Sequence, residues 1–85
     1  ATKVIFFNEL RGLYSSKSFD ELTELVAMDS RIGESHMMVP GPDMKRGFGG
    51  MCLPKDTAAF VTSAKRKGSP LTLLEKVIEI NKGIR

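Results

Sequence analysis

A long stretch near the middle of the chain limits what the rest of it can form. Residues 30–52 contain five glycines and two prolines, with no sustained helical or strand period. A structureless segment of this length is usually functional or disordered, and by length alone a solvated linker is an equal alternative. The dense glycine around Phe48 favours function, because glycine lets backbone N–H groups approach a ligand closely. The 85-residue chain then has room for one small domain.

The first 14 residues predict a helix. Phe6, Leu10, Leu13 and Tyr14 recur at the i, i+4, i+7, i+8 spacing of one helical face. The run Val4–Phe7 is apolar in all directions, which indicates either a piece of a longer helix or a helix buried against a partner.

Three further helices are predicted. A capping box of Ser18 and Glu21 starts the second helix, which should fade by residues 28–29. The third covers residues 54–67 and ends at Gly68, and the fourth starts at residues 69–70 and runs to about Lys82. Their predicted inward faces contain Leu22, Leu25, Val26, Ala58, Phe60, Val61, Ala64, Leu71, Leu73, Leu74, Val77, Ile78 and Ile80. The predicted fold is therefore an all-α single domain over residues 1–85, with four helices and one long Gly/Pro-rich loop.

Composition and charge exclude several classes of protein. The longest apolar run is far too short to cross a bilayer and no signal-peptide pattern opens the sequence, so we expect a cytoplasmic protein without a membrane contact. A net charge of +3 permits an anionic partner, but one tyrosine and no tryptophan are available for base stacking, so nucleic acid is not expected. One cysteine and one histidine provide neither an internal disulfide nor a zinc ligand set, and no metal is expected.

The single cysteine, Cys52, lies between the glycines and the start of the third predicted helix. Pro54 suits the first helical position, so Cys52 would face unpaired N–H groups and the positive end of the helix dipole. This environment, with Lys55 beside it, favours a thiolate. If the helix begins a little before Pro54, Asp56 follows Cys52 by one turn, and a sulfur and a carboxylate then share one face, which suits a nucleophile with a proton-transfer group. The alternative is a buried cysteine that serves as a small apolar residue.

The run GFGGMCLPKD, residues 47–56, is similar to the active-site motif of the UDP-glucose/GDP-mannose dehydrogenase family. The family pattern is Gly-Phe-Gly-Gly-x-Cys-x-Pro-Lys-Asp, and every fixed position is filled. Residues 29–33 and 39–46 also resemble the family, and its UDP-glucose branch more than its GDP-mannose branch. The resemblance covers essentially the whole chain and corresponds to the family's central helical domain. It implies that two flanking nucleotide-binding domains, and an upstream catalytic lysine and asparagine, are absent from this chain, and that Asn8 is not that asparagine.

The resemblance also implies an activity and a set of site residues. The parent enzyme would oxidise the C6 alcohol of a UDP-sugar to a carboxylate in two hydride transfers to NAD. Cys52 would hold the aldehyde as a thiohemiacetal and the acid as a thioester, and Asp56 would assist proton transfer or orient the hydrolytic water. Lys55 would contact the cofactor. The implied substrate-binding residues are Arg31, Lys45, Arg46, Gly47, Phe48 and Gly49.

A homodimer through the first helix is the expected assembly, because a small four-helix domain cannot cover Val4–Phe7 from one side. In the family, the arginine matched by Arg31 extends into the substrate site of the neighbouring subunit; its alternative role is an exposed charge. The chain has no Gly-x-Gly-x-x-Gly fingerprint after a strand, so NAD would bind in the absent domains and the chain alone would be inactive. The alternative function is a non-catalytic helical dimerisation module with an idle cysteine motif. A free-standing phosphate-binding helical protein is a weaker one.

Overall fold

The computed structural model describes residues 1–85 and consists of four α-helices, which confirms the predicted all-α fold. The helices are α1 (Thr2–Arg11), α2 (Ser16–Ala27), α3 (Leu53–Arg66) and α4 (Thr72–Ile84). Residues 28–52 connect α2 to α3 without a helix or strand. None of the helices has the length and apolar character that a membrane span requires.

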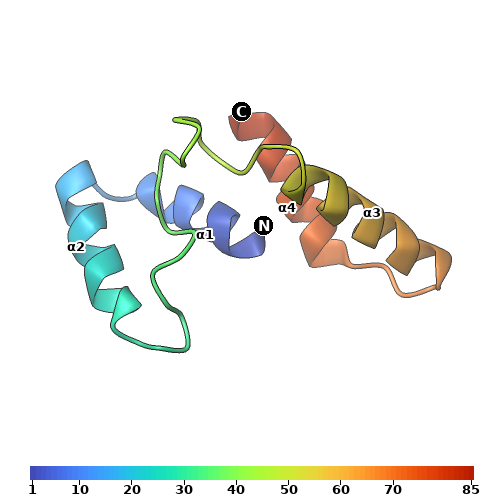
Figure 1. Cartoon of the computed structure of the whole chain (residues 1–85), viewed down its shortest axis with the longest axis horizontal. Coiled ribbons are helices and arrows are strands. Elements are labelled where there is room, and N and C mark those ends of the chain that lie inside the picture. Colours follow the sequence, from blue (N-terminus) through green and yellow to red (C-terminus); the bar gives the residue numbers. More distant parts are fainter.

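Helix α1 lies at the centre of the molecule, with α2 on one side and the α3–α4 pair on the other (Figure 1). It contacts both α2 and α4, whereas α3 packs against α4. The result is an elongated domain of 43 × 27 × 22 Å. The long loop crosses from α2 to α3 over α1 in this view.

The core is divided into two small clusters, one on each side of α1. Ile5, Phe48 and Val77 form the first cluster, between α1, the loop and α4. The second cluster joins α1, α2 and the loop, and consists of Phe7, Phe19 and Met37. Because α1 contributes to both clusters, it holds the two halves of the domain together.

The prediction of which face of α1 is buried is wrong. Ile5, Phe7 and Asn8 are buried, whereas Phe6 is 58% exposed and Leu13 lies exposed beyond the end of the helix. The spacing argument assumes one buried stripe, but α1 has partners on two sides, so residues on both of these sides are covered.

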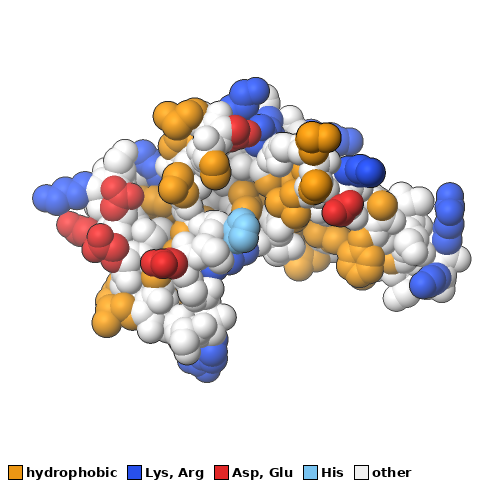
Figure 2. Space-filling model, viewed as in Figure 1, with side chains coloured by type: hydrophobic (Ala, Val, Ile, Leu, Met, Phe, Trp, Pro, Cys, Tyr) orange, Lys and Arg blue, Asp and Glu red, His pale blue; other side chains and the backbone are white.

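The other helices agree with their predicted positions and differ in detail. Ser15 caps α2 in place of Ser18, because the Ser18 backbone N–H donates to Ser15 Oγ over 3.3 Å. Helix α4 continues through Gly83. Apolar residues on the predicted inward faces that are in fact exposed are Leu25, Ala58, Phe60 and Leu73. Figure 2 shows that hydrophobic side chains also gather on the surface over the loop and along α3.

Candidate functional site

Two buried asparagines hold the backbone of the glycine-rich segment. Asn8, on α1, accepts a hydrogen bond from the Gly47 N–H over 2.9 Å and donates to the Val4 carbonyl over 2.8 Å. Asn81, on α4, accepts from the Phe48 N–H over 2.7 Å and donates to the Phe48 carbonyl over 2.9 Å. Both asparagines are buried. Residues far apart in the sequence therefore fix the start of the motif between α1 and α4.

Apolar contacts fix the same segment on either side of Cys52. The Phe48 side chain is only 5% exposed and packs with Ile5 and Val77. Leu53, the residue after Cys52, packs against the same cluster. The four residues between these two anchors form a short bridge, and Cys52 is at its end.

Cys52 is an exposed free thiol at the N-cap of α3. Pro54 lies in the first turn, as the sequence predicts, and the Asp56 N–H donates to the Cys52 carbonyl over 2.8 Å. Lys55 and Asp56 are both exposed in this turn. The alternative of a buried cysteine is therefore wrong. The exposed sulfur lies one helical turn before an exposed carboxylate, which is an accessible arrangement for a nucleophile and a proton-transfer group.

Two of the three glycines shortly before Cys52 are placed where a side chain would collide. Gly47 has φ +74°, and a Cβ at this position would overlap the side-chain oxygen of Asn81. A Cβ on Gly49 would overlap the guanidinium group of Arg85. Gly50 has φ +91° and open space around it. The conformation and the close approach at Gly47 thus both require glycine.

Arg85, at the end of α4, joins the helix to the loop by charge. Its guanidinium forms an ion pair with Asp43 and donates to the Arg46 carbonyl over 3.3 Å. The pKa of Asp43 is lowered, first by the hydrogen bond from Arg85 and then by that from the Lys45 backbone N–H. Lys45 and Arg46 have exposed side chains close in sequence to the glycines.

A hollow of about 700 Å³ adjoins the glycine segment. Three predicted substrate-binding residues, Gly47, Phe48 and Gly49, line it, and so do Gly50 and Leu53, which lie close to Cys52 in the sequence. Lys45 and Arg46 do not line it. The remaining lining residues are Val4, Glu34, Ser35, His36, Met38, Gly41, Pro42 and Asp43.

Arg31 is tied to its own neighbour. Its guanidinium contacts the Asp29 carboxylate at 2.8 and 3.1 Å, and its backbone N–H donates to the same group. The side-chain hydrogen bond from Arg31 is the main cause of the lowered pKa of Asp29, and Asp29 raises the pKa of Arg31. Within one chain, Arg31 does not line the hollow at the glycines.

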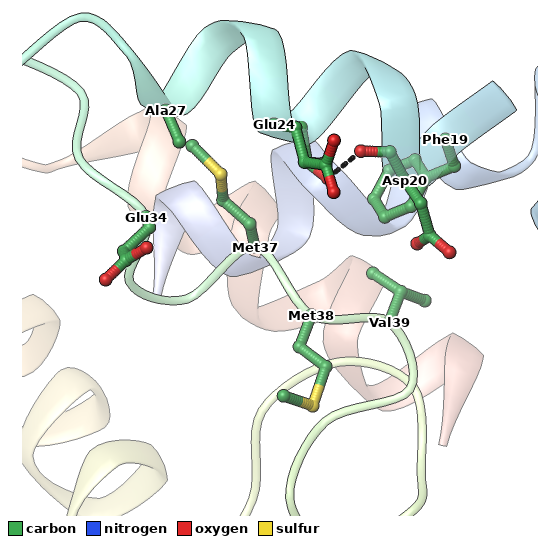
Figure 3. Close-up of a pocket in the computed structure, with 9 residues that line it drawn as sticks. Phe19, Asp20, Glu24, Ala27, Glu34, Met37, Met38 and Val39 are labelled. Atoms are coloured by element: carbon green, nitrogen blue, oxygen red, sulfur yellow. Dashed lines mark hydrogen bonds between the residues drawn. The ribbon is translucent and has the colours of Figure 1, made fainter. Parts of the chain in front are cut away.

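A second, smaller hollow of about 310 Å³ lies between α2 and the loop (Figure 3). Met37 points from the loop toward Ala27 of α2, and Asp20, Glu24 and Glu34 supply the charged part of the lining. No group of three or more acidic, histidine or cysteine side chains is placed to hold a metal ion. None of the predicted site residues lies here.

Reasoning from the sequence missed Asn8, Asn81 and Arg85 as parts of the site's framework. A usable signal was present for Asn81, because it follows Val77 by four residues and so lies on the apolar stripe of its helix. Asn8 has the same relation to Val4. A polar residue on an apolar stripe is buried with its hydrogen bonds satisfied or marks a site.

Comparison with known proteins points to the same family as the motif at residues 47–56. Residues 1–83 match the sequence-family model described as UDP-glucose/GDP-mannose dehydrogenase family, central domain. UDP-glucose 6-dehydrogenase TuaD of Bacillus subtilis is 39% identical over 83 residues, which are 95% of this chain and 17% of TuaD. UDP-glucose 6-dehydrogenase AglM of Haloferax volcanii is 34% identical over 85 residues, 98% of this chain and 19% of AglM. The UDP-glucose 6-dehydrogenase of Rhizobium meliloti is 34% identical over 83 residues, 95% of this chain and 18% of the relative. The chain thus spans less than a fifth of the length of these relatives.

Proposed function

Because the chain belongs to the UDP-glucose/GDP-mannose dehydrogenase family, as its central domain, we propose that it is part of an NAD-dependent UDP-glucose 6-dehydrogenase. The observation that carries this proposal is the exposed thiol of Cys52 at the N-terminus of α3, behind a glycine segment docked between α1 and α4. The similarity to several UDP-glucose 6-dehydrogenases supports the substrate class.

In the proposed reaction, Cys52 acts as the nucleophile on the sugar's C6 aldehyde. Its sulfur forms a bond to C6 while the aldehyde oxygen takes the thiol proton, which gives a thiohemiacetal. Loss of a hydride from C6 and of the proton from its hydroxyl group converts this to a thioester. Water then attacks the carbonyl carbon, the C–S bond breaks, and the carboxylate and free thiol are released. Asp56, one turn along α3, takes a proton from the attacking water or orients it.

NAD would accept the hydrides of both oxidation steps. Residues 1–85 form no strand followed by a glycine turn and helix, the arrangement that binds a dinucleotide pyrophosphate. We therefore assign NAD binding to parts of the protein beyond these residues. From this chain we assign only Lys55, which is exposed and lies three residues after Cys52, to a contact with NAD.

The UDP-sugar would occupy the hollow at the glycine segment, against Gly47, Phe48 and Gly49. Phe48 is buried in the core and its backbone N–H and carbonyl are both bonded to Asn81, so it would shape the wall of the hollow and offer a ligand no free N–H group. Lys45 and Arg46 have exposed cationic side chains that suit the two phosphate groups.

We propose a homodimer through α1, in which Arg31 reaches the partner's substrate. Phe6 is an exposed aromatic residue on α1, flanked by residues that are already covered. A symmetric contact through α1 would cover this side chain in both subunits. Arg31 would have to exchange its contact with Asp29 for one with the anionic ligand.

The test uses the full-length protein, with UDP-glucose oxidation followed by NAD reduction. Cys52→Ser should lower turnover on the order of 10³-fold or more, as loss of a nucleophile does. Met51→Ala, at the neighbouring exposed position, is the matched control and should retain turnover. Full turnover by Cys52→Ser would favour the non-catalytic dimerisation module with an idle cysteine motif.

A further inference from the structure

We infer that Asn8 and Asn81 are positioning residues for Cys52, because their side chains fix the backbone from which the cysteine segment extends. The inference rests on the proposed function and adds a role for two residues outside the cysteine motif. It concerns placement alone, since neither side chain is part of the GFGGMCLPKD run.

Each asparagine uses both its amide oxygen and its amide nitrogen. The Asn81 amide pairs with both polar backbone groups of Phe48, at 2.7 and 2.9 Å. Asn8 receives the Gly47 N–H at 2.9 Å, and its own amide N–H is held by the Val4 carbonyl at 2.8 Å. Because Val4 lies one turn earlier on α1, this second bond fixes the orientation in which the Asn8 oxygen faces Gly47.

Only side chains satisfy these backbone N–H groups. Gly47 and Phe48 donate to no backbone carbonyl, and both bonds are buried. A buried N–H without a partner is costly, so the asparagines decide whether this backbone stays buried or moves out to water. An apolar residue at position 8 or 81 would fit its helix but would leave the backbone N–H of Gly47 or Phe48 without a hydrogen-bond acceptor.

The position of Cys52 follows from this docking. Phe48 and Leu53 pack on the same cluster, at the two ends of the Gly49–Cys52 bridge. Gly49 and Gly50 have no side chains that could hold the bridge, and Met51 is exposed. If Phe48 leaves its site, the bridge loses its first anchor, and the thiol loses its fixed position relative to the hollow, which Gly50 and Leu53 line and Cys52 does not.

The experiment compares Asn8→Ala and Asn81→Ala with Phe19→Leu in the full-length protein. Phe19 is buried in the other cluster, so Phe19→Leu disturbs the core without touching the glycine segment. Hydrogen exchange by mass spectrometry of the peptide that contains residues 47–52, kcat at saturating substrates, and the melting temperature are measured for each variant.

In the asparagine variants we expect faster exchange in the 47–52 peptide and a fall in kcat of about 10- to 100-fold, as for a misplaced reacting group. Phe19→Leu should lower the melting temperature and retain kcat. Unchanged exchange, or a kcat that falls no further than in Phe19→Leu, would overturn the inference.

Failure of the proposed function gives a different result. If the wild-type full-length protein oxidises no UDP-sugar, that proposal fails, and the alkylation rate of Cys52 by iodoacetamide then decides the inference. Slower alkylation in both asparagine variants, with the wild-type rate in Phe19→Leu, would support positioning. Equal rates in all variants would overturn it.

Discussion

Two glycines of the loop have nearly the same φ angle in different surroundings, which allows a matched comparison. Gly47 has φ +74° and Gly33 has φ +70°. A Cβ on Gly33 would meet open space, whereas one on Gly47 would overlap the buried Asn81 side chain. The left-handed conformation alone costs an L-residue about 1–2 kcal/mol.

We therefore expect Gly33→Ala to lower the free energy of unfolding by about 1 kcal/mol, which is the conformational cost alone. Gly47→Ala should lower it by about 2–4 kcal/mol, because the Asn81 hydrogen bonds must also move. Urea denaturation of the two variants measures the difference. Equal losses would show that the contact between Gly47 and Asn81 has no energetic role.

The ion pair of Asp43 and Arg85 predicts a pH dependence of stability. Arg85 holds the pKa of Asp43 below its usual 3.8, so the carboxylate stabilises the fold above about pH 4. This contribution is lost as the pH falls through the lowered pKa. The melting temperature of Asp43→Asn should therefore lie below that of the wild type at pH 7, and the two should converge in acid.

Asp29→Asn is the control for this prediction. Asp29 also has a lowered pKa, but its partner Arg31 is only two residues away and remains close in the unfolded chain. The difference from wild type at pH 7 should be smaller than for Asp43→Asn. Added salt should reduce both differences, because the side chains are partly exposed.

Residue by residue, the sequence predicted the parts of the site that lie within one motif. Pro54 placed the start of α3, and hence Cys52 at its N-terminus with Asp56 one turn later. Asn8 and Asn81 could not be placed, because their bonds join residues 39 and 33 positions apart. The spacing of apolar residues within one helix predicts the buried face of that helix, but not which loop packs against it.

Among the single elements, helix α1 contains two adjacent aromatic residues that differ in burial. Phe7 is 3% exposed and packs with Phe19, whereas Phe6 is largely exposed. We expect Phe7→Asp to unfold the chain, since it buries an unpaired charge. Phe6→Asp should keep the helix content measured by circular dichroism.

The same pair tests the proposed dimer. Light scattering should give twice 9.4 kDa for the wild type and 9.4 kDa for Phe6→Asp. A wild-type monomer at high micromolar concentration would contradict both the α1 contact and the cross-subunit role of Arg31 for this chain.

The four helices were predictable because glycine, proline and apolar spacing separate them clearly in the sequence. The buried faces of these helices were harder to predict. Phe60 and Leu73 fit an apolar stripe and are nevertheless exposed, while Thr57 is buried, with its hydroxyl bonded to the Leu53 carbonyl at 2.6 Å. The spacing of apolar residues shows which of them share one face of a helix, but the elements packed against the helix decide which of them are buried.

For the whole molecule, the arrangement predicts binding properties of the isolated chain. Its four helices contain no dinucleotide-binding turn, so calorimetry should detect no saturable NAD binding and the chain should not oxidise UDP-glucose. Saturable binding at micromolar affinity would contradict this expectation. Oxidation by the full-length protein is the positive control.

The anchoring of the glycine segment by both α1 and α4 also sets an order of events during synthesis. Gly47 meets Asn8 from the part of the chain made earlier, but Phe48 meets Asn81, which leaves the ribosome 33 residues later. Until α4 has emerged, the Phe48 backbone lacks its partner and the first cluster lacks Val77. A nascent chain that stops short of residue 81 therefore displays the thiol on a loop that Asn8 alone holds, and the cysteine segment reaches its final place only when α4 has formed.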